Sequence, residues 1–236
     1  MRSCLIRILV TVAIVFALLW FGLPFGASWL ATNALNAAGF TGTSTQVEIS
    51  ATLPPRIMLG HADKIRLTST QVSVGDLHAA TMDVSLNDVQ LFDRTFGSAD
   101  GTLTGVRVFT PTGDGMTIDT VVVHGEGTAA SATLTVSNAE AELLVATQLK
   151  AHTSLTGTVK VASPDKVTIT INGQSKQGRL VARDGSLLMV PNSTDIPTVV
   201  LLQAGSGNPF RLTTVSVGAS AVTLGGTIDL QSLLGL

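Results

Sequence analysis

The 236-residue sequence is poor in residues that carry redox chemistry or hold ligands by stacking. Its only cysteine is Cys4, so everything beyond the N-terminus lacks disulfides and thiolate chemistry. The chain has no tyrosine, and its aromatic residues beyond residue 39 are five phenylalanines. Sites for sugars or unstacked bases usually contain aromatic platforms. The composition therefore argues against both kinds of ligand.

Charge is also sparse, at 13% of residues, and its sign excludes one class of partner. Arg2 and Arg7 account for two of the 14 basic residues, which leaves 12 against 16 acidic ones in the rest of the chain. A nucleic-acid interface needs a basic face. We expect no nucleic-acid partner.

The sequence lacks the common motifs of catalytic and metal-binding sites. The four histidines stand alone, without a His-x-x-x-His pair, and neither a Gly-x-Ser-x-Gly elbow nor a phosphate-binding Gly-x-x-x-x-Gly-Lys occurs. We expect no enzyme, no metal site and no cofactor. Convergence of the scattered carboxylates Asp76, Asp83, Asp88, Asp93 and Asp100 in a hydrolase site is the open alternative.

The longest feature present is an apolar run from Ile8 to Leu30, with no charged residue between Arg7 and Glu48. As a helix, the run is long enough to cross a hydrocarbon layer of about 30 Å. Phe25 and Ala27 match a signal-peptidase site poorly, so residues 1–30 are predicted to be an uncleaved transmembrane anchor, with a cleaved signal peptide as the alternative. Positive charge before the run predicts a cytoplasmic N-terminus, one membrane crossing, and residues 31–236 on the extracytoplasmic, periplasmic side.

Beyond the run, apolar residues alternate with polar ones in roughly ten segments, which predicts a mostly β domain. In the segments 62–74 and 77–91 the parity of the alternation changes, near Ser69 and after Asp88. Such changes predict bulges and a strongly bent antiparallel sheet.

Helices to cover these strands are few. The clearest is predicted from Ser137, where Ser137 and Glu140 form a capping box, and a short one follows Pro55. So little helix leaves two alternatives for the apolar strand faces. Either the sheet closes on itself as a barrel or sandwich, or another molecule fills its concavity.

Several stretches resemble the LmeA family of actinobacterial envelope proteins, which bind phospholipid. The resemblance covers most of the extracytoplasmic chain, although each stretch is degenerate by itself. Likeness to the AsmA-type lipid-transport proteins is weaker and rests on the anchor followed by amphipathic strands. The stretches that carry the first resemblance are Pro55–Gly60, Asp63–Leu67, Val72–Leu77, Met82–Val89, Asn208–Val215 and Leu224–Leu230.

The resemblance implies an α+β, mostly β fold in which a strongly curved antiparallel sheet wraps around a few helices, as in tubular lipid-binding proteins. It also implies binding or transfer of phospholipid in support of envelope lipid or glycolipid metabolism. A structural or adaptor protein with a closed β core is the alternative, and no protein partner is identified. The candidate apolar lining is Ile57, Met58, Leu59, Ile65, Leu67, Met82, Val84, Leu86, Leu144 and Leu149, and the candidate headgroup residues are Arg56, Lys64 and Arg66. For Ile57, Met58 and Leu59, ordinary core packing competes with a role at the mouth of a pocket or in contact with lipid.

Overall fold

The computed structural model describes residues 40–52, 55–74, 77–93, 95–109, 115–126, 129–204 and 210–229. The predicted anchor at residues 1–30 lies outside the described residues. Within them, no helix combines the length and the apolar character needed to cross a membrane.

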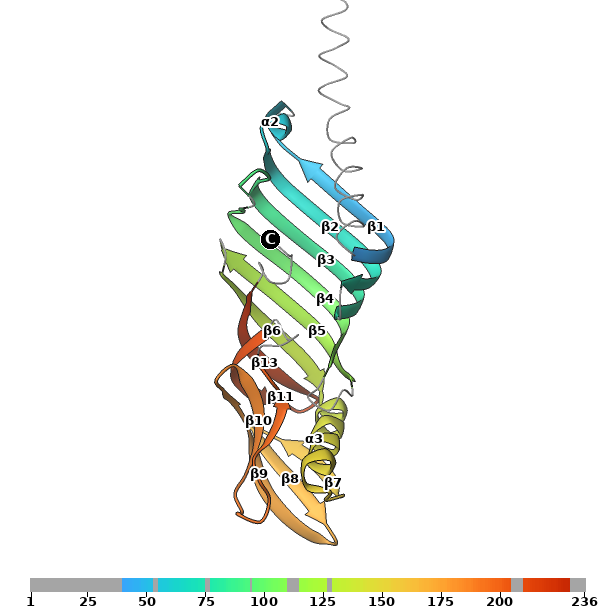
Figure 1. The fold of residues 1–236 in the computed structure, drawn as a ribbon, viewed down its shortest axis with the longest axis vertical. Coiled ribbons are helices and arrows are strands. Elements are labelled where there is room, and N and C mark those ends of the chain that lie inside the picture. Colours follow the sequence, from blue (N-terminus) through green and yellow to red (C-terminus); the bar gives the residue numbers. More distant parts are fainter. Residues whose placement is uncertain are drawn as a thin grey trace, which may run out of the picture.

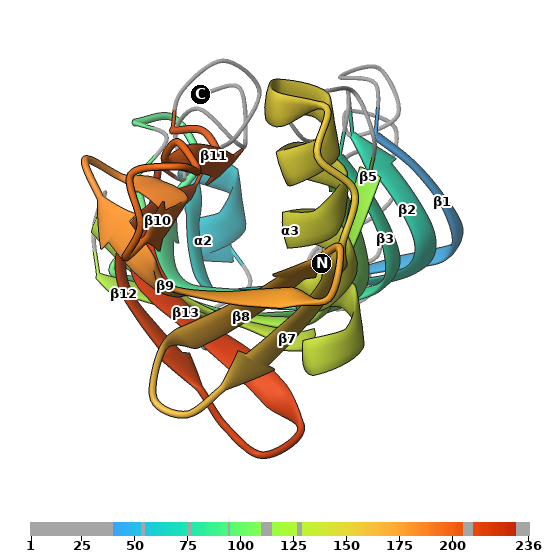
Figure 2. The ribbon, with the colours of Figure 1, turned by 90° about the horizontal axis from the view of Figure 1, so that it is seen from below.

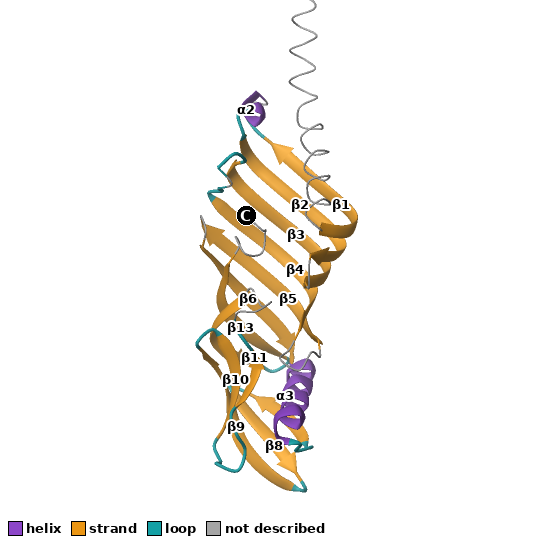
Figure 3. Ribbon diagram, viewed as in Figure 1, coloured by secondary structure: helices purple, strands orange, loops and turns teal. Residues whose placement is uncertain are grey.

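Within the described residues, two antiparallel sheets and two helices make up the elongated fold (Figures 1 and 3). The larger sheet has eight strands in the order β1-β2-β3-β4-β5-β6-β13-β12, and the smaller has five in the order β11-β10-β9-β8-β7. The larger sheet contains β1 (Phe40–Ser50), β2 (His61–Val74), β3 (Leu77–Gln90), β4 (Ser98–Phe109), β5 (Gly115–Glu126), β6 (Ala129–Ser137), β12 (Phe210–Val217) and β13 (Ala221–Asp229). The smaller contains β7 (Thr158–Ala162), β8 (Lys166–Ile171), β9 (Gln174–Arg183), β10 (Ser186–Pro191) and β11 (Val199–Leu202), and the helices are α2 (Pro55–Met58) and α3 (Asn138–Thr153).

Period-two alternation explains why these segments form half-buried strands. In β6, Ala132 and Leu134 are buried while Ser131 and Thr133 are exposed, so one face of the strand joins the core and the other meets water. Strands β1 to β6 each pair with their sequence neighbours, and β13 then pairs with β6 to bring the C-terminal hairpin into the same sheet.

The strands of the larger sheet bend where their parity changes, as predicted. Ser44 in β1, Gln71 in β2 and Gly105 in β4 all have positive φ, at 54°, 50° and 58°; we call these three residues the bend row. Ala80 lies between Gln71 and Gly105 in the register of β2, β3 and β4. Asp88, at the second predicted parity change, also has positive φ. Figure 1 shows β1 and β2 turning sharply at the right-hand edge of the sheet.

Helix α3 joins the two sheets. Its cap is half of the predicted capping box, because the Ser137 hydroxyl accepts a hydrogen bond from the Glu140 backbone N–H at 3.2 Å. The Glu140 carboxylate does not return to the cap; it accepts from the backbone N–H of Thr117 in β5 at 2.9 Å. Two residues on, Glu142 accepts from the N–H of Val161 in β7 at 3.2 Å. Carboxylates of one helix therefore bind a backbone donor in each sheet.

The core beneath α3 is tightly packed. Leu144, Val145 and Leu149 are buried against strands of both sheets, and Figure 2 shows the helix standing between them. A cavity of about 10 Å³ remains there, lined by Leu144 and Val145 and by Met116, Leu180 and Leu224 among others. Such a volume holds at most about one water molecule. This part of the protein is a solid core.

The predicted sheet that curves strongly and wraps around helices is not observed. The larger sheet is open, neither sheet is strongly curled, and β1 and β12 are its two separate edges. The physical reason is that the strands from β7 to β11 pair among themselves. They form a second sheet that packs with α3 instead of extending and closing the first. The coarser prediction, an antiparallel and mostly β fold with few helices, is confirmed.

Gly105 is the point at which the bend should be most sensitive to substitution. A Cβ there would lie 2.9 Å from the Cβ of Ala80, in addition to the positive φ. We expect Gly105→Ala to lower the free energy of unfolding by about 2–4 kcal/mol, from backbone strain plus overpacking. Chemical denaturation measures the change.

Gly173→Ala is the matched control, because Gly173 has φ +78° but nothing within 4 Å of its added Cβ. It should lose only about 1 kcal/mol, the backbone contribution. Adding Ala80→Gly to Gly105→Ala should recover the steric part of the loss. Equal losses for Gly105→Ala and Gly173→Ala would contradict the close packing of the bend.

Candidate functional site

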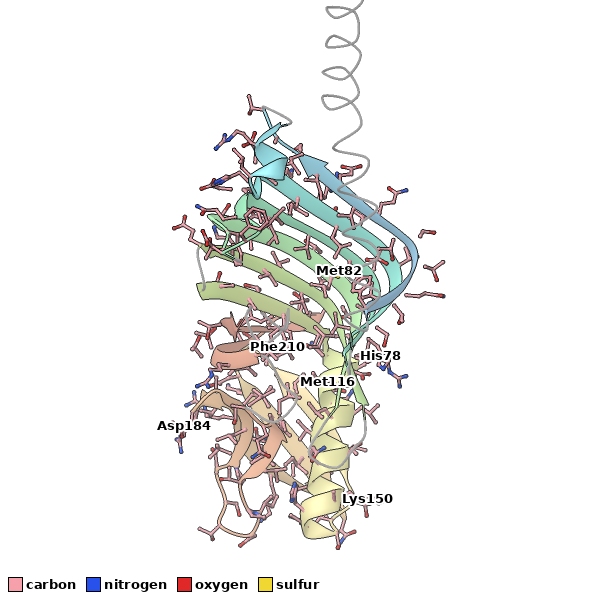
Figure 4. All side chains as sticks on the ribbon, turned by 45° about the horizontal axis from the view of Figure 1, so that its top comes forward. His78, Met82, Met116, Lys150, Asp184 and Phe210 are labelled. Atoms are coloured by element: carbon pink, nitrogen blue, oxygen red, sulfur yellow. The ribbon has the colours of Figure 1, made fainter. Side chains whose placement is uncertain are left out.

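Five aliphatic side chains from β2 and β3 gather on the inner face of the larger sheet, and we call them the inner-face patch: Ile65, Leu67, Met82, Val84 and Leu86. Ile65 pairs with Leu86 and Leu67 with Val84 across the two strands, while Met82 pairs with Ser69. All five are half-buried, although each belongs to the apolar side of its strand. Figure 4 shows Met82 on this face, far from Lys150 near the end of α3.

The patch leads into the core on one side. On β4, Leu86 faces Ala99 and Met82 faces Leu103, and both of these β4 residues are buried. Between them Gly101 faces Val84, and a Cβ on Gly101 would approach the Val84 methyl to 2.9 Å. The Val84 side chain therefore occupies the space that a side chain at position 101 would take.

The two described helices lie at the margins of the patch. Helix α2 packs on β2, where Ile57 is buried with Val47, Ile49, Ala62 and Val89. The main contacts of α3 are with β5, β6 and β13 of this sheet and with β7 and β11 of the other. The stretch of the inner face between the helices is consequently only half covered.

The other predicted lining residues do not join the patch. Leu144 and Leu149 belong to the solid core under α3. Leu59 is 68% exposed, and the side chain of Met58 lies outside the described residues. Of the ten candidates, five form the patch and Ile57 closes one end of it.

The predicted headgroup residues do not face the patch. Lys64 and Arg66 alternate with Ile65 and Leu67 and are exposed on the outer face of β2. Arg66 donates two hydrogen bonds to Asp83, at 3.0 and 2.8 Å. Hydrogen bonding between the two groups raises the pKa of Arg66 and lowers that of Asp83. An acyl chain on the inner face would have these cations on the far side of the sheet.

Arg56, the third headgroup candidate, lies near α2 with its guanidinium 3.6 Å from the Asp63 carboxylate. A hydrogen bond from the Thr52 hydroxyl to that carboxylate, at 2.6 Å, is the main reason that the pKa of Asp63 is lowered. Arg56 is therefore the candidate cation at the end of the sheet, already partnered but about half exposed.

A polar hollow at the bend row was not predicted from the sequence. It has a volume of about 340 Å³ and is open to solvent. Met82 is its apolar contact with the patch. Hydroxyl, amide and carboxylate side chains supply the rest of the lining: Ser44, Gln46, Thr68, Ser69, Thr70, Thr81 and Asp83. The recurrence of serine and threonine around the parity change was the available signal, but the bend itself brings them together.

Titratable side chains form isolated pairs on the outer surface. Besides Arg66 and Asp83, His124 contacts Asp100 at 2.5 Å, with both side chains more than half exposed. Among the residues that the structure describes, three or more His, Cys, Asp or Glu side chains nowhere gather closely enough to hold a metal ion.

Comparison with protein-family models, curated proteins and solved structures finds no match to this chain. The function is therefore argued from the inner-face patch and the sequence.

The pair of His124 and Asp100 gives a pH prediction. The hydrogen bond that the Asp100 carboxylate accepts from the imidazole, followed by the negative charge of Asp100, raises the pKa of His124 above 6.5. Its stabilising contribution is then fully present below pH 6.5 and is lost as the pH rises through the folded-state pKa. NMR titration should show the raised pKa, and Asp100→Asn should return it towards 6.5. An unchanged pKa in Asp100→Asn would contradict the pairing.

Proposed function

We propose that this protein is a membrane-anchored, extracytoplasmic phospholipid-binding protein that holds an acyl chain against the inner-face patch and supports envelope lipid metabolism. The observation that carries the proposal is the half-buried state of five adjacent aliphatic side chains on an otherwise buried sheet face. Contiguous apolar surface of this kind marks a binding site more often than an unused surface.

The chemistry of the patch suits an acyl chain. Ile65, Leu67 and Leu86 offer apolar contact without directional bonds, and each CH₂ group removed from water contributes about 0.8 kcal/mol. Several methylenes along β2 and β3 would supply enough binding energy. The anchor predicted from residues 8–30 would hold the domain at a source of phospholipid. The resemblance to the LmeA family supports the same ligand class.

The proposed mode is an open apolar face and not a closed tube. A binding cavity for a small molecule usually measures about 300–1,000 Å³, far above the roughly 10 Å³ enclosed under α3. The polar hollow is not a headgroup site for such a chain, because Thr68 and Asp83 in its lining share the outer face of the sheet with Arg66. Under this proposal the protein binds or transfers lipid and performs no covalent chemistry.

The small cavity also favours a second candidate function. A structural or adaptor protein would use a solid core such as the one under α3 and would cover the inner-face patch with a protein segment. The two functions differ in what protects Leu67 and Leu86 from water.

Leu67→Asp and Leu86→Asp test the lipid proposal in the full-length protein. Either charge should remove about 2 kcal/mol of apolar contact, which corresponds to roughly thirtyfold weaker binding. Phospholipid that remains with the detergent-purified protein, counted by mass spectrometry, should fall accordingly.

Val122→Asp is the matched control for lipid that merely surrounds the anchor. Val122 is a β-strand aliphatic that is 46% exposed on β5, where it pairs with Thr102 and Thr133 on the outer face. Its substitution should leave the lipid count unchanged, and circular dichroism should show all three variants folded. Equal lipid counts for folded Leu67→Asp, Val122→Asp and the unsubstituted protein would contradict lipid binding at the patch.

A further inference from the structure

One end of the larger sheet carries large apolar side chains that point into solvent. Phe92 is 76% exposed, Leu59 68% and Leu91 40%, and all three lie in the loops beside α2. We call these three residues the apolar tip. In Figure 1 α2 marks this end at the top of the molecule, opposite the smaller sheet.

The apolar tip is a defined structure of two joined loops. The Leu91 backbone N–H donates to the Gly60 carbonyl at 2.7 Å, which ties the loop after β3 to the loop before β2. The Phe92 ring lies directly against Gly60, where any Cβ would be 2.5 Å from a ring carbon. Gly60 also has φ +81°, so both its backbone conformation and its contact with the ring require glycine. The exposure of Phe92 is thus held by local packing.

Buried apolar residues connect the tip with the inner-face patch. Ile57, two residues before Leu59, packs in a cluster against which Ile65, Leu67 and Leu86 are placed. A buried apolar cluster therefore lies between the tip and the patch.

The chain length allows this end to reach the bilayer of the predicted anchor. Ten Cα–Cα steps separate Leu30, the last residue of the apolar run, from Phe40, and they span at most about 36 Å. Strand β1 has 11 residues and covers about 34 Å towards the tip. The connecting segment can therefore place the start of β1 as far from the membrane surface as β1 is long. Strand β1 then runs back towards the membrane and brings the tip to its surface.

The sequence around the tip is balanced in charge, with Arg56 and Arg94 against Asp63 and Asp93. Arg56 is close to Asp63, and exposed Asp93 follows Phe92 directly, so the described surface has no basic cluster to select anionic lipid. Aromatic and aliphatic side chains at a membrane interface bind through the area that they bury. Attraction at this end should consequently depend little on salt.

From these observations we infer that the apolar tip, with Phe92 and Leu59 foremost, inserts into the outer leaflet of the membrane that holds the anchor. The partner is a lipid bilayer, recognised by apolar insertion. The inference rests on the proposed membrane anchor but does not require lipid on the inner-face patch.

Single-cysteine labelling of the full-length protein tests the insertion. In a Cys4→Ser background, Phe92→Cys and Leu59→Cys carry an environment-sensitive fluorophore, and the protein is reconstituted in phosphatidylcholine vesicles. Leu143→Cys, which replaces a 60% exposed leucine on α3, and Lys150→Cys at the far end of the same helix are the controls. Probes at 92 and 59 should shift to shorter emission wavelength and be quenched by lipid-attached quencher, at low and high salt alike. Probes at 143 and 150 should stay in water.

The outcomes separate this inference from its alternatives. Tip probes as water-exposed as those at 143 and 150 would overturn it. Tip probes that are shielded from aqueous quencher but untouched by lipid-attached quencher would also overturn it, in favour of a protein partner or a second copy of the chain. Lipid counting on the detergent-purified protein, before reconstitution, examines the patch separately, so inserted tips with an empty patch would contradict only the lipid-binding proposal.

Discussion

The structure depends on how much sheet a single helix can cover. Helix α3 has 16 residues, which gives a length of about 24 Å. Eight strands at about 4.8 Å spacing are about 34 Å across. The helix lies at the junction of the two sheets, where Glu140 and Glu142 accept hydrogen bonds from the backbone N–H groups of Thr117 and Val161. The face of β2 and β3 is left half covered as a direct result.

This division gives the two ends of the molecule different characters. Around α3 both sheets contribute buried aliphatic side chains, and almost no space remains. Around β2 and β3 the strands are long, they bend at Ser44, Gln71 and Gly105, and their apolar side is half exposed. The proposed lipid site therefore lies where none of the described helices or strands covers the sheet, and the apolar tip stands at the end of the same sheet.

Local patterns predicted the local structure well. Parity changes located the bends near Gln71 and at Asp88, and Asp184-Gly185, a dipeptide typical of hairpin turns, has φ of 53° and 78°. Asn172-Gly173 makes the same kind of turn, and this dipeptide in the sequence already indicates it. The apolar segment 199–202, whose sequence suits a helical turn as well as a strand, is strand β11.

The alternation of apolar and polar residues did not predict how distant strands are arranged. Alternation shows which side of a strand is apolar but not which sheet the strand joins, so the separation of β7–β11 into a second sheet was missed. The same limit explains why Leu144 and Leu149 were grouped with Leu67, since all are aliphatic and face inward. The direction of Lys64 and Arg66, by contrast, follows from the alternation itself. The exposure of Phe92 depends on its contact with Gly60, 32 positions earlier in the chain.

Photo-crosslinking tests the central claim most directly. A phospholipid with a diazirine in its acyl chain would be added to the full-length protein, and the crosslinked residues would be mapped by mass spectrometry. The account predicts adducts on the inner-face patch, at Ile65, Leu67, Met82, Val84 or Leu86. Unlabelled phospholipid should reduce the yield of these adducts. Adducts confined to the apolar run at residues 8–30, with none on β2 or β3, would contradict it.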